Sequence, residues 1–92
     1  MTQNVLTLLK YGVPRDIVKV TPGDDPLAEP AIGLMTPTAG RVVVKTSGGV
    51  NRAIDMRNGQ QVNVGVTHVF SSAEVDGSNT TTTAATVYAL IP

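Results

Sequence analysis

The 92-residue chain contains no cysteine and no tryptophan, and only three aromatic residues, Tyr11, Phe70 and Tyr88. Without cysteine there is neither a disulfide framework nor a thiolate ligand for a metal, and such a chain can fold in a reducing compartment. A chain this short forms one domain around one core. Small domains without disulfides or metals often depend on a partner for stability, so we expect one here.

A surplus of charge of one sign is also absent. Seven Lys and Arg residues balance seven Asp and Glu residues, which gives a formal net charge of zero. Binding to nucleic acid depends on clustered cations that neutralise phosphates. The composition therefore argues against a nucleic-acid partner.

Long apolar runs are lacking as well. No stretch approaches the roughly 20 apolar residues of a membrane-spanning helix. The first residues have neither the basic region nor the long apolar region of a signal peptide. We therefore expect no membrane partner, and a soluble protein that is made without secretion.

What the sequence does have is a series of β-strand patterns separated by glycine turns. Within residues 40–46, Val42 and Val44 share one side and the intervening residues share the other. This period of two is typical of a strand with one drier face. Residues 47–49 then turn the chain, and we expect residues 51–56 to pair with the first strand as a hairpin.

Asn58 and Gly59 form the strongest turn signal, because this pair supplies the positive φ values of a type I′ hairpin turn. A strand is expected to follow as far as Phe70. Its even-numbered residues should lie on one face and Val69 on the other, unless a bulge intervenes. The stretch is long for one strand, so Gly65 can divide it into two.

The remaining segments are shorter. Residues 16–20 predict a strand, followed by a loop rich in proline and aspartate. Residues 30–37 are bounded by prolines and predict an edge strand, with Gly33 at a bulge or a close backbone approach. Residues 71–79 predict a polar loop, and residues 80–89 a β-branched strand.

These elements predict an all-β protein, a small antiparallel β-sandwich or jelly-roll-like barrel with an N-terminal arm. The arm or short helix occupies residues 1–15, and a single β-sandwich domain occupies residues 16–92. Two structures remain open for the arm. Asn4 can cap one or two helical turns, or the segment can lie extended on a neighbouring subunit, because so short a helix is marginal in water.

Residues suited to catalysis or metal binding are few. His68 is the only histidine, and no Gly-x-Ser-x-Gly sequence is present. A metal site or a Ser-His-Asp relay would need its other members from scattered residues. Asp24, Asp25 and residues 76–79 offer oxygen ligands, but not the alternating run of an EF-hand loop. We therefore expect no enzyme activity, no catalytic residue, and no metal or other cofactor.

Short strand and turn motifs follow one another through about residues 16–91. In chain order they are Val20-Thr-Pro-Gly-Asp24, Ala31-Ile-Gly-Leu34, Thr38-Ala-Gly-Arg-Val-Val-Val44, Asn58-Gly-Gln-Gln-Val-Asn-Val64, Val66-Thr-His-Val-Phe70 and Thr82-Thr-Ala-Ala-Thr-Val-Tyr-Ala-Leu90. This order resembles that of the small all-β spike-base and head-decoration proteins of tailed bacteriophages and gene transfer agents. Residues 73–79 look like an insertion in that pattern, and the family's usual proline in the strand after Asn58 and Gly59 is absent.

The resemblance implies a non-enzymatic structural virion protein, a capsid decoration (cement) or head spike-base subunit. Such a protein is made in the host cytoplasm and assembles on the surface of the phage head. Its partners would be copies of itself, as a trimer or a pentamer, and the major capsid protein. We expect the apolar arm to make oligomer or capsid contacts through Val5, Leu6, Leu8, Leu9 and Tyr11.

Two other functions remain open. One is a carbohydrate or host-surface binding module that reads its ligand through an exposed loop containing Glu74, Asp76 and Asn79. The scarcity of aromatic residues counts against it, because sugar sites normally need rings on which to stack. The other is a tail or baseplate component of the same particle.

Overall fold

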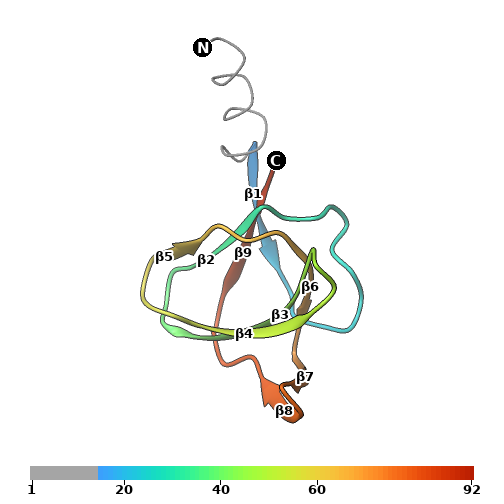
Figure 1. Ribbon diagram of the computed structural model, residues 1–92. Helices are drawn as coiled ribbons and strands as arrows, with labels where there is room; N and C mark the ends of the chain where they lie inside the picture. The colour runs from blue at the N-terminus through green and yellow to red at the C-terminus, as the bar shows by residue number, and fades with distance from the viewer. Residues whose placement is uncertain (1–14) are drawn as a thin grey trace, which may run out of the picture.

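The computed structural model describes residues 15–92, which form an all-β structure without a helix (Figure 1). The predicted fold class, a small antiparallel β-sandwich, is confirmed, although the sheets do not close into a barrel. The predicted arm lies outside the described residues except for Arg15. The strands are β1 Asp16–Val20, β2 Gly33–Thr36, β3 Gly40–Thr46, β4 Asn51–Met56, β5 Gln60–Val62, β6 Val66–Phe70, β7 Ser72–Val75, β8 Ser78–Thr81 and β9 Val87–Ile91.

Two sheets form the sandwich. Sheet A has the strand order β1-β9-β2-β5, and sheet B has the order β4-β3-β6. Alternate residues of each strand point inward, so small and branched apolar side chains from the two sheets fill the space between them. The buried core consists of Ala31, Leu34, Val42, Val44, Met56, Val66, Val69, Ala84, Val87, Ala89 and Ile91.

Asn58 and Gly59 form a corner between the two sheets. The strand that follows, β5, pairs with β2 in sheet A and not with β4. Only Gly59 of the pair has a positive φ, of 70°, and its N–H donates to the Thr36 carbonyl oxygen at 2.7 Å. The Asn58 side chain accepts a hydrogen bond from the Ala39 N–H at 2.6 Å. The predicted type I′ hairpin turn is therefore wrong here, because these bonds hold the turn against the β2–β3 corner.

The segment predicted to be a polar loop is a hairpin instead. Asp76 and Gly77 have φ values of 51° and 83°, and they join Val75 to its partner Ser78. Two consecutive positive φ values are the geometry of a type I′ turn. The strand predicted over residues 80–89 is also divided, because β8 ends at Thr81 and β9 begins at Val87.

The hairpin covers part of the outer face of sheet B. Strand β7 contacts β4, and β8 contacts β3. Val43 points away from the core between the sheets, yet it is fully buried. Beyond β8, the Thr82 hydroxyl accepts from the Val43 N–H at 2.9 Å and donates to the Phe70 carbonyl oxygen at 2.6 Å. Strand β3 is therefore dry on both faces in its middle, and not only on the predicted one.

Strand β2 lies inside sheet A, between β9 and β5, so the predicted edge position is wrong. The prolines that prompted it, Pro30 and Pro37, flank the strand and leave its ladder intact. A Cβ on Gly33 would lie 2.7 Å from the Val62 carbonyl oxygen and 3.1 Å from Leu90 Cδ1. The close backbone approach expected at Gly33 is therefore confirmed.

Gly65 separates β5 from β6, as expected. The register between β3 and β6 shifts at Lys45 and Thr46, where a bulge adds one residue to β6. As a result, Val66 and Val69 both face the core. His68 and Phe70, which pair with Lys45 and Val43 of β3, face outward. The expectation that Val69 lies on the face opposite Val66 is wrong for this reason.

Candidate functional site

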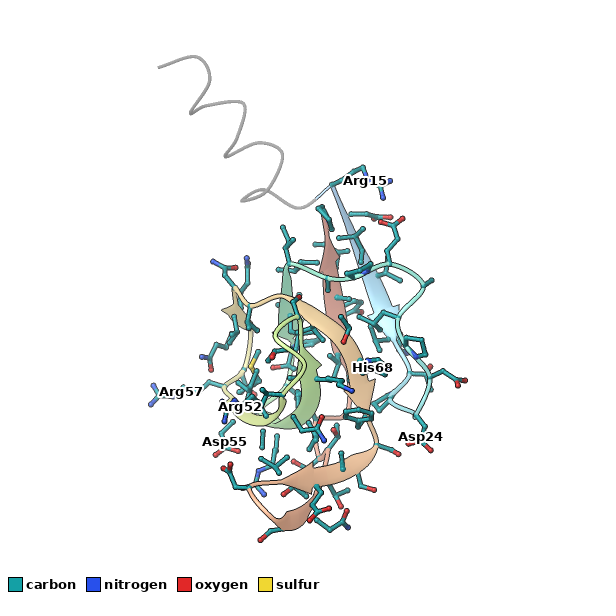
Figure 2. The ribbon with its side chains drawn as sticks, turned by 45° about the vertical axis from the view of Figure 1, so that its right-hand side comes forward. Arg15, Asp24, Arg52, Asp55, Arg57 and His68 are labelled. Atoms are coloured by element: carbon teal, nitrogen blue, oxygen red, sulfur yellow. The ribbon has the colours of Figure 1, made fainter. Side chains whose placement is uncertain are left out.

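A groove with a volume of about 620 Å³ lies between β1 and the loop of residues 21–29. In Figure 2, Arg15 marks the start of β1 and Asp24 lies on the loop. Charged side chains form the rim, and apolar side chains from β1, the loop, β6 Val66–Phe70 and β9 Val87–Ile91 line the interior. The apolar lining includes Val18, Val20, Leu27, Val69, Ala89 and Ile91.

The loop forms a fixed wall of this groove, because its backbone is bonded along the outer edge of β6. The N–H groups of Gly23 and Leu27 donate to the carbonyl oxygens of Val69 and Thr67 at 3.0 and 2.9 Å. Ala31 and Val66 exchange two further bonds of 2.9 Å. The loop thereby covers an edge that could otherwise pair with another chain.

Strand β1 forms the other wall, and its inner face is uncovered. Val18 lies opposite Ala89 in the β1–β9 ladder, so both side chains point to the same side of sheet A. Ala89 is 1% exposed, whereas Val18 is 45% exposed. Sheet B has one strand fewer than sheet A in the described part of the chain. The inner face of β1 therefore faces the groove instead of a facing strand.

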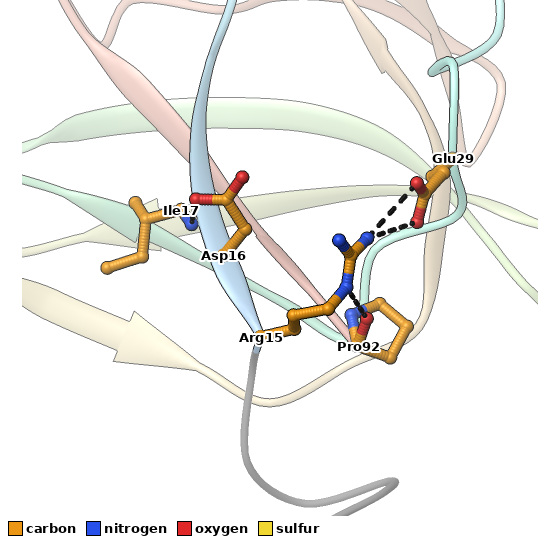
Figure 3. Close-up of polar contacts among 5 residues, drawn as sticks. All are labelled: Arg15, Asp16, Ile17, Glu29 and Pro92. Atoms are coloured by element: carbon orange, nitrogen blue, oxygen red, sulfur yellow. Dashed lines mark hydrogen bonds and ion pairs between the residues drawn. The ribbon is translucent and has the colours of Figure 1, made fainter.

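Arg15 closes one end of the groove (Figure 3). Its Nη2 atom lies 3.2 Å from both carboxylate oxygens of Glu29 on the loop, and its Nε–H donates to the Pro92 carbonyl oxygen at 3.0 Å. Both side chains of the ion pair are more than half exposed. Such a pair contributes at most about 1 kcal/mol, so its importance is to join the start of β1 to the loop.

Asp16 protects the free edge of β1. The Leu90 carbonyl oxygen accepts from the Ile32 N–H, so the backbone groups of Leu90 face β2. Its ladder partner Ile17 must then direct its own N–H away from β9. The Asp16 carboxylate accepts that N–H at 2.8 Å. A strand from another molecule would have to displace this carboxylate in order to pair with β1.

The residues predicted to make contacts form two sets, one in the N-terminal arm and one around residues 74–79. Val5, Leu6, Leu8, Leu9 and Tyr11 lie outside the described residues, so the predicted arm contacts stay a prediction.

Glu74, Asp76 and Asn79 are exposed, as predicted, but on a hairpin rather than a loop. Glu74 and Asn79 lie directly opposite each other. The Glu74 carbonyl oxygen accepts from the Asn51 side chain at 3.0 Å, which ties the hairpin to β4.

His68 lies on the outer face of sheet B, opposite to the face that carries Val69. Its ring stacks on Phe70, with the ring centroids 5.4 Å apart, and its Nδ1 lies 2.9 Å from the Thr67 hydroxyl. Within residues 15–92, no three His, Asp or Glu side chains come together as a metal site. Asp24 and Asp25 are both exposed.

The groove was not predicted from the sequence. A signal for it exists in residues 16–20, where Ile17, Val18 and Val20 put apolar side chains on both faces of one short strand.

From Arg15 onward, the structure has no helix of the length and apolarity required to cross a membrane. Among known proteins, no family model, no curated sequence and no solved structure matches this chain.

Proposed function

We propose that this chain is a non-enzymatic structural virion protein, a capsid decoration or head spike-base subunit of a tailed bacteriophage or gene transfer agent. It assembles with copies of itself and binds the major capsid protein on the head surface. The observation that carries the proposal is the serial order of strand and turn motifs from Val20 to Leu90. The antiparallel all-β fold supports it, because that order implies such a fold.

The surface of β1 adds physical support for a partner. Ile17 is 53% exposed and Val18 is 45% exposed, on opposite faces of one strand. Removing apolar surface from water stabilises a complex by about 25 cal/mol per Å² before the costs of association. The core of a domain this small supplies only a small free energy of unfolding, so covering this strand in an assembly would stabilise the domain.

Labelling of intact particles tests the proposal. Antibody raised against the purified protein is applied to tailed particles from the source organism and viewed by negative-stain electron microscopy. We expect label on the head, and co-sedimentation of added protein with heads that lack it. Label confined to the tail would favour the baseplate alternative. Absence of the protein from particles would refute both.

A carbohydrate or host-surface binding module is the second candidate, and one observation favours it. The rings of His68 and Phe70 stack on each other and are half-buried at the end of β6, just before β7, the strand that carries the exposed Glu74. A glycan array probed with the purified protein tests this function. Saturable binding that is lost in His68→Ala would place it ahead of the first candidate.

A further inference from the structure

We propose that the groove between β1 and the loop of residues 21–29 receives the apolar segment of residues 5–11 from a neighbouring copy of this chain. The inference rests on the self-assembly in the proposed function, and it names the contact by which the copies associate. It does not depend on the capsid. The contact joins the groove beside β1 of one copy to residues 5–11 of another.

The shape and lining of the groove fit a short apolar segment. Its volume of about 620 Å³ is typical of ligand pockets, roughly 300–1,000 Å³, and suits the apolar side chains of one face of a short segment. The floor is apolar, and Val18 stands 45% exposed on it. The loop wall is held by backbone hydrogen bonds to β6, so the groove exists before anything binds. A preformed groove with an apolar floor and a charged rim favours an occupant that places apolar side chains inward and polar groups at the rim.

The chain itself contains such a segment. Residues 5–11 carry Val5, Leu6, Leu8, Leu9 and Tyr11, and they end a few residues before Arg15 on the rim of the groove.

Charge also fits this occupant. Residues 1–14 contain Lys10 and no acidic residue. The groove lining carries the carboxylates of Asp16, Asp25 and Glu29 against the cations of Arg15 and Lys19. Arg15 is already paired with Glu29, so two carboxylates remain beside one lysine. Opposite charges at the rim favour the correct partner and its orientation.

The contacts of Arg15 favour the segment of a neighbour over that of the same chain. The Arg15 N–H donates to the Ile91 carbonyl oxygen at 2.6 Å, so the backbone continues along the β1–β9 ladder at this point. The Arg15 side chain bonds to Glu29 and Pro92 across the adjacent end of the groove. To enter this groove, the chain's own segment would have to turn back within residues 12–14 and pass the pair of Arg15 and Glu29. A segment from a second copy meets neither obstacle, and repeated exchange around a symmetry axis closes a ring.

The free edge of β1 is a less suitable place for the contact. Asp16 already accepts the outward N–H of Ile17, which removes a donor that an added strand would use. The groove face of the same strand has no such protection. The neighbour is therefore expected to cover the face of β1 and not to extend sheet A.

Cysteine cross-linking tests the contact in the full-length protein, because the native chain has no cysteine. One chain carries Leu8→Cys in the donated segment. A second chain, with a longer affinity tag, carries Val18→Cys on β1 or Asp25→Cys on the exposed rim of the loop. Ala53→Cys, at an exposed position of β4 on the outer face of sheet B, is the matched control. The chains are mixed, allowed to exchange, oxidised and separated by non-reducing electrophoresis.

We expect Leu8→Cys to form a disulfide-linked heterodimer with either groove variant at least tenfold more readily than with Ala53→Cys. The double variant Leu8→Cys with Asp25→Cys should give dimers and larger species. If the double variant gives only an internally linked monomer, the segment occupies its own groove and the inference is overturned. Yields equal to the Ala53→Cys control would overturn it as well. Far-ultraviolet circular dichroism confirms that each variant is folded.

Sedimentation separates this inference from the proposed function. Val18→Asp should raise the dissociation constant of self-association at least tenfold, and Ala53→Asp should leave it unchanged. If copies associate without groove cross-links and without an effect of Val18→Asp, only the groove contact fails. A protein that stays monomeric at all concentrations and never appears on particles would defeat the groove contact and the proposed function together.

Discussion

Replacing Gly40 with alanine should destabilise the domain, because the segment after β8 passes directly over this residue. A Cβ at position 40 would lie 2.6 Å from Ala84 Cα and 2.7 Å from Ala84 N. Both atoms belong to the backbone, so no side-chain rotation can relieve the contact. Either β3 or the segment of residues 82–84 has to move.

The size of the effect follows from what that movement disturbs. Three hydrogen bonds join Arg41 to the segment, from the N–H groups of Thr83 and Ala84 at 2.8 and 3.1 Å and to the Thr83 hydroxyl at 2.8 Å. Overpacking typically costs about 1–3 kcal/mol, and each weakened hydrogen bond about 0.5–1.5 kcal/mol. Loss of glycine's freedom in the unfolded chain offsets about 0.4–1 kcal/mol. With one of the three bonds weakened, these terms give a net loss of about 0.5–4 kcal/mol.

Urea unfolding followed by circular dichroism measures this loss, with Gly48→Ala as the control. A Cβ on Gly48 would meet only the Thr46 hydroxyl at 3.6 Å, which is an ordinary contact. Gly48→Ala should therefore leave the free energy of unfolding unchanged or raise it by up to about 1 kcal/mol. For a domain of this size, 1 kcal/mol corresponds to about 4–8 °C in Tm. If Gly40→Ala unfolds at the same urea concentration as the control, the proposed approach of Ala84 to β3 is wrong.

Two further predictions concern the elements around β3. Thr82→Val removes the hydroxyl that bonds to Val43 and Phe70, so it should lower the free energy of urea unfolding by about 1–3 kcal/mol. It should also speed hydrogen exchange at the Val43 amide, and unchanged exchange there would count against this role. Gly77→Ala places a side chain at a φ of 83°, so it should lower the free energy of unfolding by about 1–2 kcal/mol. Asp76→Gly should cost less than about 0.5 kcal/mol, and equal losses from the two changes would contradict a turn of this type.

Much of the fold could be predicted because its signals are local. The alternation of residues 40–46 and the glycines at 48 and 49 define β3, its turn and its pairing with β4 without help from distant residues. Residues 16–20 form a strand with the predicted bounds, and Gly65 breaks the chain where expected. Periodicity and turn chemistry act over a few residues, so the sequence by itself determined the fold class.

Turn types show where local signals stop being sufficient. Asn58-Gly59 and Asp76-Gly77 are the same kind of hairpin signal, but only the second forms a hairpin. The first is bonded to Thr36 and Ala39, about 20 residues away, and these bonds turn it into a corner between sheets. Likewise, the bulge opposite Thr46 decides that Val69 faces the core.

The candidate site depends entirely on long-range pairing. Strand β1 is recognisable from its residues, but its position at the edge of sheet A follows from pairing Asp16 with Ile91, at the far end of the chain. The groove beside it exists because the loop is bonded to β6 and sheet B does not extend over Val18. The sequence by itself determined which residues form strands. Only the tertiary structure decided which apolar face stays uncovered, because that depends on neighbours that no local pattern specifies.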